Sequence, residues 1–255
     1  MNKGITFAIG ALGLATIIAL AVPWWTNTHL PPPNIPVEEQ LNILDPNDAN
    51  LPAYDLSSAL SSTPPQNTAR PTYAQFLDTV KTKREALSTK PQARATLLHD
   101  LIHNDMVSYW DTTTWDFNGV SRIAGEGEIA CGYFVTTILQ DLGFEIDRIR
   151  LSQAVSATMI RELTKNIIIL HSVDDVIAYI KTQPSPAIYI VGLDFHTGFI
   201  SSNADGIFFI HSNYINREGV VKELAANSAA LAQSNYFMLG NLTTNEDLLA
   251  KWVKG

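Results

Sequence analysis

Residues 187–214 read AIYIVGLDFHTGFISSNADGIFFIHSNY, and this stretch decides the fold class. Short turn-like sequences separate three segments that are rich in β-branched and aromatic residues: 187–194, 195–202 and 206–214. The clearest of these turns is Asn203-Ala204-Asp205-Gly206. The pattern predicts neighbouring antiparallel strands, and Tyr236–Leu239 is expected to add another.

The chain before this stretch has the periodicity of helices, with apolar residues three and four positions apart. Helices are expected at 73–87, 91–109, 130–142 and 152–165, and from Ser172 onward. Pro91 suits a first helical turn, Gly143 suits a helix end, and Ser172 with Asp175 forms a capping pair. Helices first and antiparallel strands later predict an α+β fold, with N-terminal helices packed on an antiparallel sheet.

Residues 1–25 contain an apolar run, Ile5–Val22, that follows a single positive charge at Lys3. This composition indicates a signal anchor or a cleaved signal peptide. The run just reaches the length that spans a bilayer, whereas Ala19-Leu20-Ala21 fits a cleavage site, so both interpretations stay open. Either one predicts a bacterial-type cell envelope location, facing outward from the cytoplasm, or secretion.

Residues 26–72 are predicted to form a tether between this segment and a domain at 73–255. Ten of the thirteen prolines lie between Pro23 and Pro71, and Tyr54 is the one aromatic residue between Thr26 and Thr72. Such a stretch buries too little apolar area to offset its ordering entropy. The alternative is an extended arm that docks on the domain.

Charge and composition argue against a nucleic acid partner and against a phosphate-containing cofactor. The 255 residues carry a formal net charge of −8, and the 17 Lys and Arg residues are scattered. A nucleic acid partner is therefore not expected. No phosphate-binding glycine motif is present, and no cofactor is expected.

The single cysteine, Cys131, follows a glycine-containing loop, Gly125-Glu126-Gly127-Glu128, and falls in the first turn of the predicted helix 130–142. A lone cysteine is ordinarily a small buried hydrophobic residue. A helix N-terminus, however, favours a thiolate, because its N–H groups are unpaired and its dipole is positive. Nearby Glu126 and Glu128 are expected to oppose this by raising the pKa of the thiol.

Two histidines lie on the predicted strands. His196 begins the segment Thr197-Gly198-Phe199-Ile200, and His211 follows Phe208-Phe209-Ile210 on the next strand. A neighbouring strand can place His211 beside His196 and orient its ring. We expect a thiolate–imidazolium pair of Cys131 and His196, with a cysteine pKa below that of a free thiol.

The segments Ala130-Cys131-Gly132-Tyr133-Phe134-Val135, His196-Thr197-Gly198-Phe199 and Phe209-Ile210-His211-Ser212 resemble the NlpC-type cell-wall endopeptidases of the papain-like superfamily. The resemblance covers about Trp115 to Asn213. It implies a papain-like fold with Cys131 as nucleophile, His196 as base and His211 as orienting residue. This chain has Ala-Cys-Gly-Tyr where that family has Asp-Cys-Ser-Gly, and it lacks the family's tyrosine before the cysteine.

The resemblance implies a cysteine peptidase or amidase that cleaves an amide bond in a peptide or peptidoglycan stem. Tyr109, Trp115 and Asn118 are candidates for the missing oxyanion or substrate contact, and Asn213 competes with His211 as the orienting residue. Two alternatives stay open: a catalytically inactive papain-like binding module of the envelope, and an acyltransferase or thioesterase that uses the same Cys-His pair.

A metal site is not predicted. His99 and His103 are four residues apart on a predicted helix, which is a possible pair of metal ligands. No glutamate follows His99 and no third ligand is evident. We therefore expect the pair on a solvent-exposed helix face.

Overall fold

The computed structural model of the chain describes residues 70–87 and 89–254. The predicted signal segment 1–25 and nearly all of the predicted tether 26–72 lie outside the described residues. Within the described part of the chain, no helix is both long enough and apolar enough to cross a membrane.

A single six-stranded sheet forms the centre of the domain, and all of its neighbouring strands are antiparallel. In spatial order the strands are β1 (Lys165–Leu170), β6 (Phe237–Asn241), β2 (Ala187–Gly192), β3 (Thr197–Asn203), β4 (Gly206–Asn213) and β5 (Gly219–Leu224). The predicted α+β class with an antiparallel sheet is confirmed.

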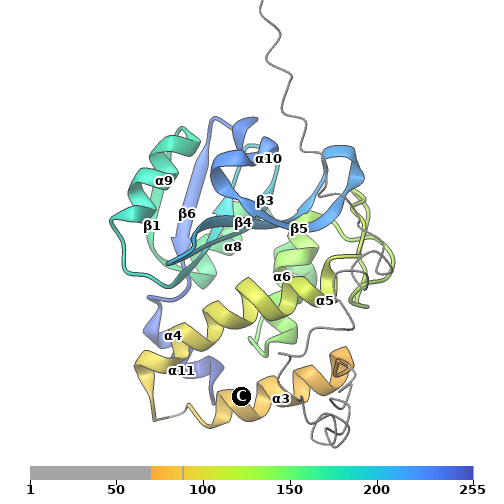
Figure 1. The fold of residues 1–255 in the computed structure, drawn as a ribbon, viewed down its shortest axis with the longest axis vertical. Helices are drawn as coiled ribbons and strands as arrows, with labels where there is room; N and C mark the ends of the chain where they lie inside the picture. The colour runs from red at the N-terminus through yellow and green to blue at the C-terminus, as the bar shows by residue number, and fades with distance from the viewer. Residues whose placement is uncertain (1–69, 88, 255) are drawn as a thin grey trace, which may run out of the picture. The chain divides into compact units, whose positions relative to one another are not determined.

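Helices cover both faces of this sheet, which gives three layers (Figure 1). One face carries α3 (Tyr73–Glu85), α4 (Pro91–Asp100), α5 (Val107–Trp110), α6 (Cys131–Asp141), α7 (Arg148–Gln153), α8 (Ser156–Leu163) and α11 (Glu246–Trp252). The other face carries α9 (Val173–Lys181) and α10 (Ala229–Ala232). Short 3-10 turns at Ile215–Arg217 and Ala225–Asn227 flank β5.

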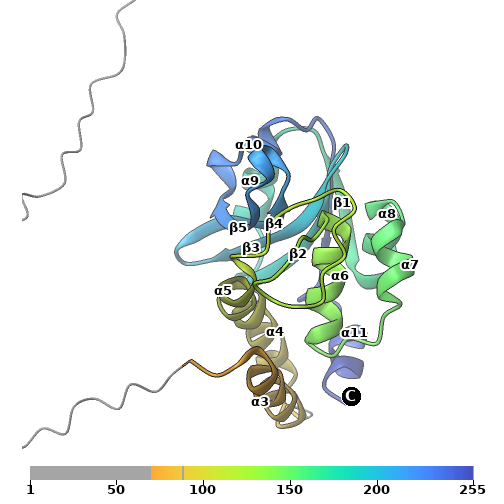
Figure 2. The same cartoon turned by 90° about the vertical axis from the view of Figure 1, so that its right-hand side faces the viewer.

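The two hydrophobic cores follow from strand alternation, because successive side chains of a strand point to opposite faces. On β2, Ile188 and Ile190 enter the core under α6, while Tyr189 and Val191 enter the core under α9. Both faces of the central strands are therefore buried, and each fully buried aliphatic or aromatic side chain contributes about 1.5–3 kcal/mol. Figure 2 shows the helices α6, α7 and α8 on one side of the sheet and α9 and α10 on the other.

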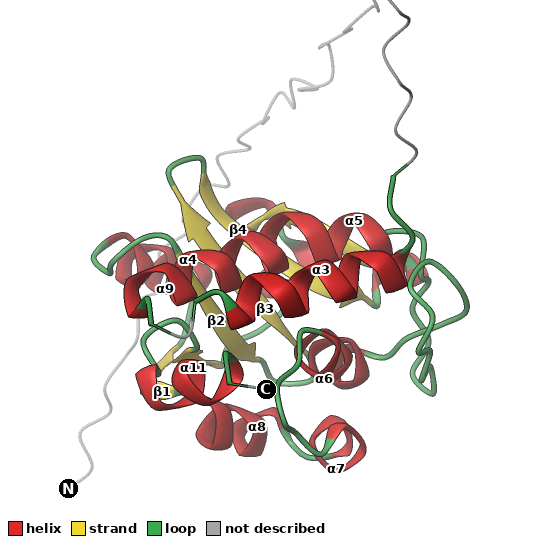
Figure 3. Cartoon of the chain, turned by 90° about the horizontal axis from the view of Figure 1, so that it is seen from below, coloured by secondary structure: helices red, strands yellow, loops and turns green. Residues whose placement is uncertain are grey.

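Several elements differ from the prediction. The predicted helix 91–109 is one continuous helical rod, in which a π-helical segment (Leu101–Met106) joins α4 to α5; Figure 3 shows it beside α3. The predicted helix 152–165 is two helices that break at Ala154, and its end at Lys165 belongs to β1. The sequence analysis did not predict strands β1 and β5. Each is an edge strand with many exposed or partly exposed residues, so its sequence lacks the strong apolar pattern of a central strand.

Candidate active site

Cys131 is the first residue of α6, and Ala130 is its N-cap. The first amide of the helix with an intrahelical acceptor is that of Phe134, which donates to the Ala130 carbonyl at 2.8 Å. The N–H groups of the first turn therefore have no helical acceptor and face the N-terminal end. The structure therefore places Cys131 at the start of the helix, as predicted. N–H groups in this turn can stabilise a thiolate or an oxyanion.

Two contacts hold this end of α6 against the sheet and against α7. The Ser212 hydroxyl on β4 donates to the carbonyl of Ile129 at 2.7 Å, two residues before the cysteine. Gly132 packs against the backbone of Ser152 at the end of α7, where any side chain would overlap the Ser152 carbonyl oxygen. The position of Cys131 is thus set by backbone contacts with two separate elements.

His196 immediately precedes β3, in a tight turn closed by a hydrogen bond from Leu193 N–H to the His196 carbonyl at 2.8 Å. Its ring is 6% exposed, although neighbouring Phe195 is 99% exposed. His196 Nε2 lies 2.8 Å from Nδ1 of His211 on β4, and the two rings are nearly perpendicular. The predicted pairing of the two histidines across neighbouring strands is present.

A glutamate that the sequence prediction lacks extends this line of side chains. Nε2 of the fully buried His211 lies 3.1 Å from Oε1 of Glu223 on β5. The His211 ring also stacks on Phe209 with a centroid separation of 3.9 Å. His196, His211 and Glu223 therefore form a hydrogen-bonded line from the turn before β3 to β4 and β5, which we call the histidine relay.

The relay dictates which nitrogens carry protons. The pKa of Glu223 is lowered, first by its hydrogen bond from His211, so the group is a carboxylate and can only accept. His211 must then donate from Nε2 and, as a neutral ring, accept at Nδ1. His196 consequently donates from Nε2, which leaves its Nδ1 unprotonated and available as a base.

Desolvation favours the neutral forms of the cysteine and of both histidines. It raises the pKa of Cys131, although the backbone N–H groups of Thr197, Gly132 and Cys131 itself lower it in part. Burial lowers the pKa of His196 well below its ordinary value, with a further contribution from His211, and burial also lowers the pKa of His211. The directions of both shifts run against the predicted resting thiolate–imidazolium pair, because desolvation disfavours the charged form of each group.

The predicted effect of Glu126 and Glu128 on the thiol is also wrong. Neither carboxylate contributes to the pKa of Cys131. The carboxylate of Glu128 instead accepts a hydrogen bond from Arg217 at 2.7 Å, and Arg217 also contacts Asp116. The charge of Glu128 is therefore paired with Arg217.

Cys131 and His196 line one groove. Two cavities, of about 800 Å³ and about 410 Å³, share the residues Cys131, Gly132, Ser152, Phe195 and His196 and so meet at the cysteine. The sulfur lies beside the backbone of Thr197, the residue after His196. Among the hydrogen bonds of the described residues, none joins the sulfur directly to the His196 ring.

Of the four additional candidates, the structure brings two to this groove. Trp115 and Asn118 line the larger cavity, and Trp115 Nε1 is buried without a hydrogen-bond partner in the described part of the chain. Tyr109 lies in the helical layer, where its hydroxyl donates to the carbonyl of Pro71 at 2.9 Å. Asn213 donates to Glu218 and accepts from the amide of Ile215, so it stabilises the turn after β4 and does not contact His196.

Other groove residues had no recognisable signal in the sequence. Tyr214 packs its ring 5.1 Å from that of His196 and 6.3 Å from that of Trp115, and its hydroxyl donates to Gln233. Gln153 donates to the Tyr133 hydroxyl on the opposite wall. These residues come together through the meeting of α6, α7 and the loops after β4, which spacing along the chain does not encode.

The pair His99 and His103 is not on an exposed face, contrary to the prediction. Both side chains are buried, and their rings stack 5.0 Å apart. His103 Nδ1 bonds the hydroxyl of Ser201 on β3 at 2.7 Å. Within residues 70–254 as described, no cluster of three or more His, Cys, Asp or Glu side chains has the arrangement of a metal site.

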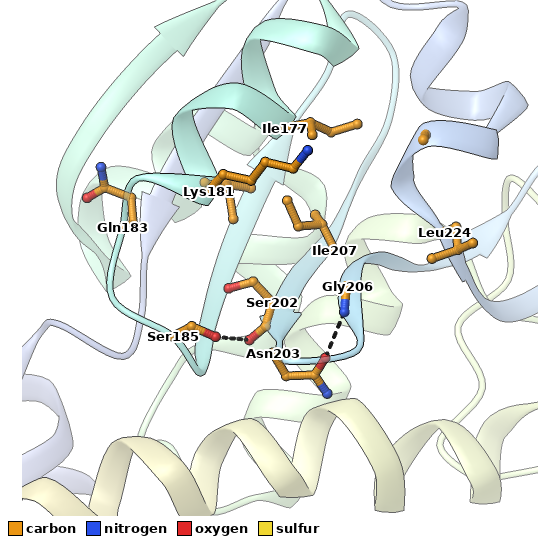
Figure 4. A pocket seen from close by; sticks show the side chains of 11 residues that line it. Ile177, Lys181, Gln183, Ser185, Ser202, Asn203, Gly206, Ile207 and Leu224 are labelled. Atoms are coloured by element: carbon orange, nitrogen blue, oxygen red, sulfur yellow. Dashed lines mark hydrogen bonds between the residues drawn. The ribbon is translucent and has the colours of Figure 1, made fainter.

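A separate pocket of about 430 Å³ lies on the opposite face, between α9 and the strands β3, β4 and β5 (Figure 4). Its walls are mainly the aliphatic side chains of Ile177, Ile180, Ile207 and Leu224. The Ser185 hydroxyl donates to the Ser202 carbonyl at its lower edge. No cysteine or histidine lines it, so the candidate nucleophile Cys131 lies outside this pocket.

Comparisons with known proteins add no further assignment: no family model, no curated protein and no solved structure matches this chain.

Proposed function

We propose that this protein is a cysteine hydrolase of the papain-like, NlpC-type kind that cleaves an amide bond in a peptide or a peptidoglycan stem. The observation that carries the proposal is the histidine relay, which ends at His196 in an open groove that Cys131, at a helix N-terminus, also lines. A structural role for a buried cysteine requires neither an oriented base nor a groove.

In the proposed reaction, the Cys131 thiol gives its proton to His196 Nδ1 as the sulfur attacks the amide carbonyl. The Cys131 backbone N–H stabilises the oxyanion, and Trp115 Nε1 is the side-chain donor that we assign as its partner. The protonated His196 then gives its proton to the leaving amine as the C–N bond breaks. His196 finally takes a proton from water, which attacks the thioester; the C–S bond then breaks, the acid is released, and His196 returns the proton to the sulfur.

The neutral resting pair suits this sequence of steps. A neutral thiol and a neutral imidazole place no charge on these desolvated groups at rest, and the charge pair forms only as the carbonyl arrives. His211 accepts from the developing imidazolium, and Glu223 compensates its charge at the end of the relay. Cys131 therefore depends on proton transfer to His196 in the attack step rather than on a preformed thiolate.

The test is to incubate the full chain with defined peptides and with purified peptidoglycan and to analyse the products by mass. Cleavage that is lost in Cys131→Ala and in His196→Ala is the expected result. Added amine or thiol acceptors separate hydrolysis from acyl transfer, because a transferase yields the acceptor adduct. Cleavage that persists in Cys131→Ala would refute the proposal.

The absence of a direct hydrogen bond between Cys131 and His196 favours one rival, the inactive binding module. The two interpretations differ in thiol chemistry. In a hydrolase, alkylation of Cys131 depends on His196, whereas in a binding module His196→Ala leaves the alkylation rate unchanged. Measuring this rate needs no knowledge of the substrate.

A further inference from the structure

The groove at Cys131 has two arms that meet at the sulfur. The larger arm runs along α6 toward Trp115 and Tyr214, and the smaller arm runs between α8 and the turn before β3. Both arms include Cys131 and His196 in their walls. A substrate that places its carbonyl at Cys131 can therefore continue into an arm on each side of the bond that is cleaved.

Among the described residues, neither arm is lined by Lys or Arg, so neither offers a cation to a substrate carboxylate. Among the described residues, no Asp, Glu, Lys or Arg lines the larger arm, and Asp194 is the one such residue in the smaller arm. The Asp194 carboxylate already accepts hydrogen bonds from Asn235 N–H at 2.8 Å and from the Ser234 hydroxyl. A substrate carboxylate bound here would lose water and find no cation, which is costly.

The two arginines near the larger arm are already engaged. Arg148 lies behind the Tyr133 ring, and its guanidinium donates to Thr137 and to the carbonyls of Val120 and Ser121. Arg217 pairs with Asp116 and Glu128. The Arg148 guanidinium is therefore not available for a substrate carboxylate without breaking these contacts, and Arg217 lies beside two carboxylates that would repel a third.

The rim of the groove is apolar and exposed. Phe117 is 78% exposed and Val120 is 51% exposed on the larger arm, Val155 is 73% exposed on the smaller arm, and Phe195 stands at the junction. Single exposed apolar residues are common, but four that surround one reactive side chain indicate a binding surface. Covering these side chains removes apolar area from water on both sides of Cys131.

From these observations, and resting on the proposed hydrolase function, we infer that the substrate is a peptide segment with apolar side chains, and without carboxylates, on both sides of the scissile bond. A peptidoglycan stem is the weaker substrate, because its amide bonds are flanked by free carboxylates. The larger arm, with Trp115, Tyr133 and Tyr214, accepts an aromatic or large aliphatic side chain.

The test uses peptide probes with a cysteine-reactive group at the position of the scissile bond. One probe has leucine and phenylalanine on the two sides, one has glutamate there, and a third is small iodoacetamide. Mass analysis of the full chain gives the rate of Cys131 labelling. We expect the apolar probe to label at least tenfold faster than the glutamate probe.

A matched pair of variants links the preference to the groove. Val120→Lys adds a cation to the larger arm and should reduce the preference for the apolar over the glutamate probe at least threefold. Ile169→Lys, at a similarly exposed isoleucine on the distant strand β1, should leave the preference unchanged.

The labelling rates distinguish failure of the substrate inference from failure of the hydrolase proposal. Equal labelling by the two peptide probes, or faster labelling by the glutamate probe, overturns the inference about the substrate but leaves the hydrolase intact if iodoacetamide labelling still depends on His196. Labelling by iodoacetamide that is unaffected by His196→Ala overturns the hydrolase itself. Labelling by iodoacetamide but by neither peptide probe also overturns the substrate inference.

Discussion

The substitution Glu223→Gln tests whether the histidine relay orients His196. The change keeps the size of the side chain and removes the charge that fixes the proton on His211 Nε2. A glutamine can also donate to that nitrogen, and the relay would then run in the reverse direction. In the reversed relay His196 carries its proton on Nδ1 and no longer acts as a base toward Cys131.

The energetic cost of Glu223→Gln follows from replacing a hydrogen bond to a charged carboxylate with one to a neutral amide. Bonds to a charged group contribute about 1.5–3 kcal/mol and neutral bonds about 0.5–1.5 kcal/mol, so the loss is on the order of 1 kcal/mol. The Glu223 side chain is 29% exposed, which limits but does not remove the effect. Because 1.36 kcal/mol is a factor of ten in rate, we expect a decrease of about five- to tenfold in His196-dependent reactivity. His211→Ala should decrease it further, by about 10²-fold, while some activity remains.

The assay combines two measurements on the full chain. The first is the rate of Cys131 alkylation near neutral pH, and the second is the ¹⁵N spectrum of labelled histidines, which distinguishes protonated from unprotonated ring nitrogens. The wild type should show protonated Nε2 on both His196 and His211. Glu162→Gln is the matched control, because its carboxylate accepts from Arg150 far from the groove.

Either of two results would refute the relay. One is a wild-type spectrum in which His196 carries its proton on Nδ1. The other is an alkylation rate in Glu223→Gln equal to that of the wild type and of Glu162→Gln.

Further predictions concern the thiol, the packing and the response to acid. Alkylation of Cys131 should have a pH midpoint above the ~8.5 of a free cysteine, because burial raises its pKa; a midpoint near pH 6 would contradict this. Gly132→Ala should lower the free energy of unfolding by about 1–3 kcal/mol in denaturant titrations, because the new methyl overlaps the Ser152 carbonyl. Ser212→Ala should cost about 1–3 kcal/mol by the same measurement, since the carbonyl of Ile129 loses its donor. Stability should fall as the pH is lowered from about 6.5 toward 4, because the pKa of His103 is lowered to about 4 in the fold and the unfolded chain takes up the proton first. The loss is at most about 1.4 kcal/mol per pH unit for this group, and His103→Gln should reduce that slope.

The α+β class and the central hairpin strands followed from the sequence alone. The β-branched and aromatic residues of 187–214 indicate strands, and turn residues such as Asn203 and Gly206 indicate where the chain reverses. Cys131 at a helix start was predictable for the same local reason, since a glycine loop followed by an apolar helical period marks an N-terminus. The contact between His196 and His211 was predictable too, because it requires only that two consecutive strands pair.

Other features depended on contacts between residues far apart in the chain. Glu223 joins the relay because β5 pairs with β4, but β5 is a short edge strand with a weak pattern of its own. The neutral state of Cys131 and His196 depended on burial, which the layers on both faces of the sheet create and which no local motif encodes. Local sequence thus determined the elements and the candidate residues, while tertiary packing decided their protonation and which of them share a groove, because desolvation depends on every element that surrounds a group.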